Sequence, residues 1–328
     1  MTNWNALYDR LRGSVPSLEL RRDEPMSRHT TFKVGGPVPL MALPKSEEEV
    51  RQAMSVAVLE FGARPFFMGK GSNLLVSDAG ADLLVIKADG LDRLELEEEG
   101  KTWVAARPNG RIVVAGSGVS MARLANFALE HGLTGLEFAH GIPGSVGGGV
   151  YMNAGAYGGE MSQVVTSVSS ADLPSRWFIR EDTDPLFSYR HSVYQERDEF
   201  ILRVGFTLEP GDPAEIKAKM DDFAQRRREK QPLEYPSAGS TFKRPPEVDG
   251  QPVYAAALID QCGLKGLTVG GAQVSEKHAG FIVNKGGATC NDIVELMAQV
   301  RERVFRETGV ALEPEVRYLG MEGDTWNF

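Results

Sequence analysis

The stretch GIPGSVGGGVYMNAGAYGGE, residues 141–160, holds eight of the 36 glycines in this chain of 328 residues. Glycine permits positive φ and lets a ligand approach the peptide plane closely. Successive N–H groups in such a stretch can point inward and hold a phosphate. A second stretch, GKGSN at 69–73, lies between two expected strands and has the same chemistry. Two separate anion-binding loops favour a diphosphate, and hence a dinucleotide; the alternative is that the glycines only mark tight turns between strands.

The standard nucleotide fingerprints are missing from both glycine loops. No G-x-G-x-x-G follows the first expected strand, and no G-x-x-x-x-G-K-[ST] occurs anywhere in the chain. Neither a Rossmann unit nor a P-loop is therefore supported.

Composition and charge place the chain among globular proteins with an acidic surface. The hydrophobic fraction is 42%, the charged fraction 25% and the formal net charge −9. Excess negative charge disfavours nucleic acid and anionic membranes as partners. The spacing of Cys262 and Cys290 indicates neither a disulfide framework nor a metal site. With no signal peptide and no apolar run of about 18 residues, we expect a cytoplasmic protein without membrane insertion.

Periodicity and capping residues predict four helices. The first spans Ser46–Phe61, with Ser46 and Glu49 as a capping box, and the second runs from Ser120 to His131. The third starts at Asp212 and ends in the basic run 226–230; its apolar face carries Ile216, Met220 and Phe223. The fourth and longest is capped by Asn291 and ends at Gly309. Strands are expected at 65–69, 74–77, 83–87, 94–96, 103–106, 112–115, 164–168, 199–208 and 315–319.

This order of elements predicts an α+β protein with more than one domain. The length exceeds that of one ordinary domain, and Glu209-Pro210-Gly211 is a natural break. We expect a long N-terminal region over 1–210 and a smaller C-terminal unit over 211–328.

Seven ordered motifs identify a family resemblance. Three lie in the first half: HTTFKVGGP (29–37), GKGSNLLVSD (69–78) and the 141–160 stretch. Four follow: FSYRHS (187–192), PSAGSTFKRP (236–245), GGAQVSEKHAGFIVN (270–284) and LEPEVR (312–317). Together they resemble the UDP-N-acetylenolpyruvoylglucosamine reductases over residues 20 to 320.

The resemblance implies a fold and a reaction. The fold is the vanillyl-alcohol-oxidase-like (PCMH-like) FAD-binding fold, with two α+β subdomains at about 20–90 and 91–210. A smaller α+β substrate domain, 211–328, returns its last strand near 315–320 to the flavin site. NADPH would reduce non-covalently bound FAD, and the flavin would reduce the enolpyruvyl ether of UDP-N-acetylglucosamine to UDP-N-acetylmuramate for peptidoglycan synthesis. The oligomeric state stays open, and a monomer fits these expectations.

The chain is similar to the shorter of the two types in this family. After Tyr189-Arg190 it proceeds directly to the strand at 199–208. The longer type inserts a tyrosine-bearing loop there that closes over substrate, so that tyrosine has no counterpart here.

The resemblance assigns three catalytic residues. Arg190 would hold the substrate carboxylate, since a guanidinium offers a charged planar fork. Glu315, rather than Glu313, matches the catalytic glutamate; a raised pKa from burial is the usual device for such a group. Ser240 matches the proton donor, with Thr241 as its nearby rival.

The remaining assignments are cofactor and substrate contacts, and no metal is expected. Lys70 replaces the small residue usual at its position, and could point outward or touch a phosphate. The expected FAD contacts are Gly69, Lys70, Gly71, Ser72, Asn73, Gly141, Gly144, Ser145, Gly148, Asn153 and Gly158. The expected substrate contacts are Tyr189, Lys230, Lys277 and His278.

Two other functions remain open at this point. An oxygen-using sugar or hydroxy-acid oxidase could share the FAD fold, although residues 141–160 contain no His or Cys to tether a flavin. A nucleotide-binding protein without activity is the other, and the presence of Arg190, Ser240 and Glu315 together argues against it.

Overall fold

The computed structural model describes residues 2–97, 110–172, 177–181, 187–197, 199–247 and 250–321. The chain forms two compact units. Unit 1 comprises Met1–Arg22, Leu40–Lys70 and Leu83–Arg227, and unit 2 comprises Asp23–Pro39, Gly71–Asp82 and Arg228–Phe328. Both units mix helices and strands, which confirms the α+β prediction. The functional division at residue 210 stays a prediction.

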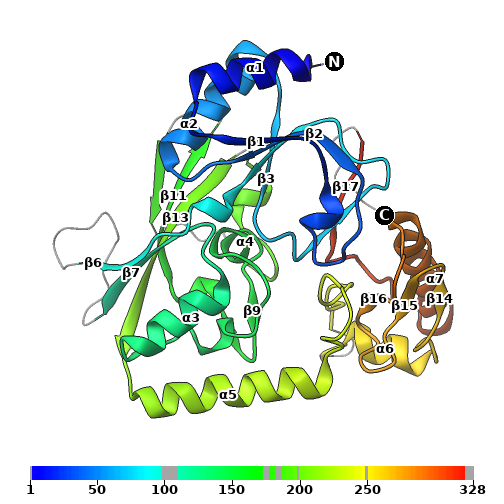
Figure 1. Ribbon diagram of the computed structural model, residues 1–328. Coiled ribbons are helices and arrows are strands. Elements are labelled where there is room, and N and C mark those ends of the chain that lie inside the picture. Colours follow the sequence, from blue (N-terminus) through cyan, green and yellow to red (C-terminus); the bar gives the residue numbers. More distant parts are fainter. Residues whose placement is uncertain are drawn as a thin grey trace. The chain divides into compact units, whose positions relative to one another are not determined.

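The first layer of unit 1 is a four-stranded sheet in the order β1-β2-β5-β3 (Figure 1). Its strands are β1 (Glu19–Pro25), β2 (Pro37–Leu43), β3 (Pro65–Met68) and β5 (Leu84–Lys87). β5 pairs in parallel with both β2 and β3. Because β5 is buried on both faces, its sequence LVIK is almost continuously apolar. Helices α1 (Trp4–Ser14) and α2 (Glu47–Ser55) pack their buried leucines, valine and methionine into the same core.

The second layer of unit 1 is an antiparallel sheet in the order β12-β11-β13-β7-β6, with β8 beside the end of β13. Its strands are β6 (Leu94–Glu97), β7 (Arg111–Gly116), β8 (Leu133–Thr134), β11 (Val165–Asp172), β12 (Trp177–Glu181) and β13 (Glu199–Pro210). The register pairs Val168 with Val204 and Phe206 with Val113. These buried residues meet α3 (Met121–Glu130), α4 (Val146–Tyr151) and α5 (Pro213–Lys230) in one apolar cluster. The short strands β9 (Gly155–Ala156) and β10 (Gly159–Glu160) form a hairpin after α4.

Unit 2 is built around a small sheet and two helices. Strands β14 (Thr268–Val269), β15 (Ala272–Val274) and β16 (Ile282–Asn284) form an antiparallel sheet. Helix α7 (Cys290–Thr308) packs on this sheet and on α6 (Ala255–Gln261). A parallel pair, β4 (Leu74–Val76) with β17 (Arg317–Leu319), completes the unit. Its core includes Phe32, Val34 and Leu75, which come from the N-terminal half of the chain.

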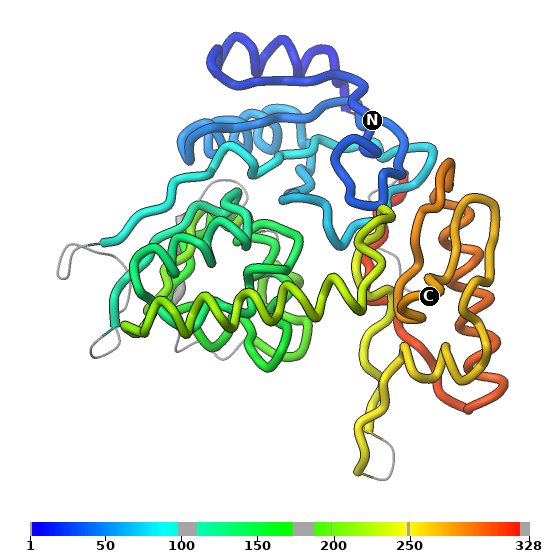
Figure 2. Tube along the Cα trace, turned by 60° about the horizontal axis from the view of Figure 1, so that its bottom comes forward, coloured from blue at the N-terminus to red at the C-terminus, as the bar shows by residue number. Residues whose placement is uncertain are grey.

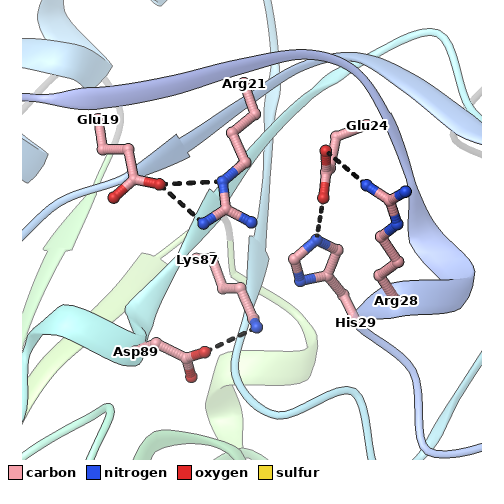
Figure 3. A network of polar contacts seen from close by, with 7 residues as sticks. All are labelled: Glu19, Arg21, Glu24, Arg28, His29, Lys87 and Asp89. Atoms are coloured by element: carbon pink, nitrogen blue, oxygen red, sulfur yellow. Dashed lines mark hydrogen bonds and ion pairs between the residues drawn. The ribbon is translucent and has the colours of Figure 1, made fainter.

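The remaining regular structure is single 3-10 turns, at Met26–Arg28, Ala88–Gly90, Glu137–Ala139, Met161–Gln163 and Val193–Gln195. The first of these carries a buried ion pair of unit 2: His29 Nε2 lies 2.9 Å from Glu24, and Arg28 lies on the other carboxylate oxygen (Figure 3). His29 therefore has a packing and hydrogen-bonding role in unit 2.

Three predicted helix ends need correction. The helix expected over Ser46–Phe61 stops at Ser55 and continues as a π-helical turn over Val56–Glu60, which keeps Val56 and Ala57 in the core. Glu49 accepts from the N–H of Lys45 instead of closing the box on Ser46. The cap of α7 is Thr289 and not Asn291, because Thr289 and Asp292 form a reciprocal capping box. Gly309 ends α7 at φ 73°, as expected.

The other helices and the expected strands agree closely with the structure. The helix predicted over Ser120–His131 is α3, and the one starting at Asp212 is α5. Seven of the expected strands appear within one to four residues at each end, as β3, β4, β5, β6, β7, β11 and β13. The last expected strand is shortened to β17. The strand expected over 103–106 lies outside the described residues.

Candidate functional site

Several glycines of the 141–160 stretch serve close packing. A Cβ at Gly147 would lie 2.8 Å from Ser117 Cβ, and a Cβ at Gly159 would lie 2.5 Å from the Phe138 ring. The N–H groups of Gly147 and Gly149 already donate to the carbonyls of Ser117 and Ser145. For these positions the turn-and-packing interpretation of the glycines holds.

Other backbone groups in the same stretch have the free donors that an anion requires. Within the described residues, nothing accepts from the N–H groups of Gly141, Gly144 and Ser145. Gly144 has φ 145° and Gly158 has φ 86°, values that side chains disfavour. Gly148 is exposed, and a Cβ there would meet only Ser145 Oγ at 3.5 Å. These donors and this open backbone fit the diphosphate of FAD.

The two glycine loops meet inside unit 1. A Cβ added to Gly69 would lie 2.2 Å from Ser145 Oγ, so only glycine lets the backbone at residue 69 come this close to the second loop. Ser145 Oγ also accepts from the N–H of Gly148 at 3.4 Å. The contact places the predicted cofactor residues Gly69, Ser145 and Gly148 together.

Lys70 belongs to a charge cluster with Asp89 and Lys87. Its ammonium lies 2.9 Å from Asp89 Oδ1, and the buried Lys87 lies 2.6 Å from Asp89 Oδ2 (Figure 3 draws the second pair). Burial alone would raise the pKa of Asp89, but hydrogen bonds and charge from Lys70 and Lys87 outweigh it and lower that pKa. Asp89 is therefore ionised at neutral pH, and the cluster carries net positive charge beside Gly69.

Asn153 positions the segment that carries Arg190. Its side chain is buried, accepts from the N–H of Ser162 at 3.0 Å and donates to the carbonyl of Ser188 at 3.0 Å. Its buried amide therefore braces the loop that was expected to bind substrate.

Arg190 stands in a strained conformation on this loop. Its φ is 55°, which is rare for a residue with a side chain and typical of functional sites. The guanidinium donates to the carbonyl of Gly155 at 3.1 Å and lies 5.3 Å from the centre of the Tyr189 ring. Tyr189 is largely exposed. The strain is held by Gln195, which donates to the carbonyl of Arg190 at 2.9 Å.

In unit 2, Asn73 brackets the backbone around Glu315. Its side-chain amide donates to the carbonyl of Glu315 at 3.0 Å, and its own carbonyl accepts from the N–H of Arg317 at 3.1 Å. Gly71 and Ser72 precede it, and no described residue accepts from their N–H groups. The end of the first glycine loop and the predicted catalytic glutamate thus share one backbone network.

The same network links the backbone of Glu315 to Thr241, the residue that follows Ser240. It also distinguishes Ser240 from Thr241, the alternative proton donor. The N–H of Glu315 donates to the carbonyl of Thr241 at 2.8 Å. The Thr241 hydroxyl is fully buried and accepts from the N–H of Ile282 at 3.0 Å, whereas Ser240 is exposed. Accessibility therefore favours Ser240 as the proton donor, and Thr241 holds the fold.

The expected substrate contacts of unit 2 have unequal surroundings. Lys230 is exposed at the end of α5. Lys277 donates to the carbonyl of Arg228 at 2.6 Å, so it caps the last turn of this helix. Burial lowers the pKa of His278, whose neutral ring accepts from the N–H of Gly280 at 3.1 Å. Glu313 is an exposed partner of Lys243.

Sequence analysis missed one basic residue of unit 1. Arg227 belongs to the basic run 226–230 at the end of α5, yet its Cδ would lie 3.2 Å from a Cβ on Gly141. The signal was present in the sequence, because Arg227 follows Met220 and Phe223 at helical spacing on the inward face of α5.

Comparisons with known proteins agree with this geometry. Residues 38–174 match the family model of the FAD binding domain, which bears out the predicted FAD-binding fold. Residues 231–319 match the C-terminal domain of UDP-N-acetylenolpyruvoylglucosamine reductase.

Similar proteins cover almost the whole chain. The UDP-N-acetylenolpyruvoylglucosamine reductase of Caldanaerobacter subterraneus subsp. tengcongensis is 44% identical over 96% of this chain and 98% of its own length. That of Clostridium botulinum is 46% identical over 92% of this chain and 93% of its own. The crystal structure of UDP-N-acetylenolpyruvylglucosamine reductase from Thermus caldophilus matches with TM-score 0.73 and 33% identity, over 92% of this chain and 98% of that one. The chain therefore belongs to the UDP-N-acetylenolpyruvoylglucosamine reductase family.

Proposed function

We propose that this protein is an FAD-dependent reductase that uses NADPH to convert UDP-N-acetylenolpyruvoylglucosamine to UDP-N-acetylmuramate. The single observation that carries the proposal is identity of 44% to a reductase of that name over 96% of the chain. The reaction belongs to peptidoglycan synthesis, and through it to cell shape and division. We place it in the cytoplasm; among the described helices, none is long and apolar enough to cross a bilayer.

The residues of unit 1 bind FAD and the substrate carboxylate in this proposal. Backbone donors at Gly141, Gly144 and Ser145, with Gly69 packed against them, hold the diphosphate of FAD. Bound FAD supplies the hydride that adds to the enolpyruvyl carbon. Arg190 presents its guanidinium to the carboxylate on which negative charge develops, and its fixed, strained backbone avoids reorganisation during the reaction.

The residues of unit 2 complete the proton transfer. Ser240 gives its hydroxyl proton to the carbon next to the carboxylate, where charge has accumulated. The backbone of Glu315 is held by Asn73 and by the carbonyl of Thr241, the residue next to Ser240, and the proposal assigns its carboxyl to stabilising the charge that develops. Lys230 and the segment around Lys277 and His278 contribute to the UDP end of the substrate.

The test separates hydride transfer from turnover. Purified protein should be yellow with one FAD per chain, and the NADPH-reduced flavin should regain its absorbance at 450 nm when the enolpyruvyl substrate is mixed with it under anaerobic conditions. If the protein purified without flavin and took up none, or released peroxide with simple sugars instead, the proposal would be wrong.

Ser240→Ala tests the proton donor. We expect this half-reaction to slow by about 100-fold or more, with unchanged FAD content because Ser240 is exposed. Thr241→Val is the matched control: it should lower stability, since the N–H of Ile282 loses its acceptor, and leave proton transfer in place. Equal rates for Ser240→Ala and the unchanged protein would refute the assignment.

A further inference from the structure

Arg227 is a desolvated cation in unit 1 that the mechanism above does not use. It lies on α5 one turn after Phe223, and Figures 1 and 2 both show α5 as one long helix. The buried Ile216 and Met220 of this helix share an apolar cluster with residues of α3 and α4. Its side chain is half-buried and its Nε atom is fully removed from solvent. Burial lowers the pKa of Arg227, opposed by a hydrogen bond to Tyr157.

The position of Arg227 is fixed by three neighbours. Tyr157 opposes the effect of burial on the pKa of Arg227, and the Tyr157 ring stacks on Phe223 with centroids 4.6 Å apart and planes at 8°. Tyr157 itself has φ 54°, a strained value for a tyrosine. On the other side, Gly141 leaves room for the arginine stem, since a Cβ there would lie 3.2 to 3.4 Å from Cδ, Nε and a terminal nitrogen.

The charge of Arg227 lacks a counter-ion among the residues described. No carboxylate pairs with it there, in contrast to the adjacent Arg226, which lies 2.9 Å from Asp222. Its only side-chain partner is a neutral phenol, and Nε has no partner. Even partial burial of a charge without a counter-ion is unfavourable, and arginine keeps its proton. A ligand anion would remove this cost.

A second unpartnered group lies beside the same loop. His140, adjacent to Gly141, has a buried Nδ1 without a hydrogen-bond partner. Together with the free N–H groups of Gly141, Gly144 and Ser145, this gives an unpartnered ring nitrogen and three backbone donors along one loop, with Gly141 next to the cation. Such a set matches two linked phosphates better than a single carboxylate, because it offers several donors along an extended loop.

We propose that Arg227, held by Tyr157, is the cation that neutralises a diphosphate lying on the His140–Ser145 segment. The inference rests on the proposed function, which supplies two diphosphates: that of FAD and that of the UDP-sugar. Lys70, the sequence-based candidate for this task, is already engaged by Asp89.

The experiment compares Arg227→Gln with Arg226→Gln in the full-length chain. Each variant loses one positive charge, so the two have the same net charge. Only Arg227 lies against the glycine loop, at Gly141. FAD is removed and titrated back, with flavin fluorescence giving the dissociation constant; the UDP-sugar is titrated against the reloaded protein. We expect Arg227→Gln to weaken one of these two ligands by about 10- to 100-fold, with Arg226→Gln within twofold of the unchanged protein.

The pattern of affinities identifies the source of the diphosphate. Weaker FAD binding with unchanged UDP-sugar binding assigns Arg227 to the flavin, and the reverse assigns it to the substrate. Inorganic pyrophosphate should raise the melting temperature of the FAD-free protein and fail to do so for Arg227→Gln. If both affinities and the pyrophosphate effect were unchanged, the inference would be wrong even though the reductase assignment stood.

Further variants keep the test decisive if Arg227→Gln folds poorly. Arg227→Lys keeps the charge and loses the planar fork, and Tyr157→Phe removes only the hydroxyl and keeps the ring that stacks on Phe223; each should weaken the same ligand by a smaller factor. Failure of the unchanged protein to bind FAD would instead count against the proposed function.

Discussion

At the scale of single residues, the roles of chemically similar side chains are separated by burial. Ser240 and Thr241 are neighbours that both carry a hydroxyl. Thr241 is buried and its hydroxyl accepts from the N–H of Ile282, whereas Ser240 is exposed. Likewise Arg226 pairs with Asp222 in solvent, whereas Arg227 turns inward against Gly141. Sequence motifs single out Ser240. Helical spacing after Met220 and Phe223 indicates the inward face for Arg227, and the contact with Gly141 shows it.

Asp89 gives a prediction at the same scale. Asp89→Asn should lower the free energy of unfolding at pH 7 by about 1.5 kcal/mol, more than for an exposed pair and less than for a fully buried one. Asp89 is partly exposed, but Lys70 and the buried Lys87 lose the charge between them. Chemical denaturation measures this. Asp221→Asn, which breaks the exposed pair with Lys217, is the control and should cost less than about 1 kcal/mol.

The pH dependence of this effect has a defined sign. The folded pKa of Asp89 is lowered, so its stabilisation is fully present above the unfolded pKa of about 3.9. The stabilisation is lost as the pH falls through the folded-state pKa of Asp89, which lies below the unfolded-state pKa. The gap between Asp89→Asn and the unchanged protein should therefore narrow below about pH 4; a gap that stayed constant down to pH 2.5 would contradict this role.

At the scale of elements, the start of α7 shows how side chains from distant segments complete a helix. Thr289 and Asp292 satisfy each other's backbone N–H groups, and Asp78 accepts from the N–H groups of Cys290 at 2.8 Å and Asn291 at 3.0 Å. The loop after β4 is thereby fastened to α7 within unit 2. Sequence spacing located this helix but shifted its cap by two residues, since both Thr289 and Asn291 are good capping residues.

The corrected cap predicts unequal effects of two alanine substitutions. Thr289→Ala should lower stability by about 1 kcal/mol, because Asp292 loses the acceptor for its N–H. Asn291→Ala should change it by less than about 0.5 kcal/mol, because its side chain is exposed. Thermal denaturation of the two variants side by side decides between them, and a larger loss in Asn291→Ala would restore the original assignment.

At the scale of the whole molecule, the two units are interleaved along the chain. Unit 2 takes residues 23–39 and 71–82 from the N-terminal half. Phe32 is fully buried in its core, the side chain of Asn284 donates to the carbonyl of Phe32 at 3.0 Å, and β17 pairs with β4. A single cut anywhere between residues 83 and 227 would therefore divide this unit.

This interleaving predicts that residues 228–328 do not fold alone. The fragment lacks Phe32, Val34 and Leu75 from its core, and a cavity of that size costs several kcal/mol, comparable to the whole stability of a small domain. We expect poor dispersion of its NMR signals and no cooperative thermal transition, while the full chain shows one. A cooperative thermal transition in the fragment alone would overturn this prediction.

The sequence by itself determined the α+β class, four of the seven α-helices and eight of the seventeen strands that the structure describes. It also determined the family and the candidate residues, because these depend on local periodicity, capping residues and ordered motifs. The tertiary structure decided what each candidate touches. Only packing shows that the glycine loops meet at Gly69 and Ser145 and that Asn153 braces the Arg190 loop. The glycine excess of residues 141–160 accordingly has two causes: close contacts at Gly147 and Gly159, and free donors at Gly141 and Gly144. Composition cannot separate them, since both require only the absence of a side chain.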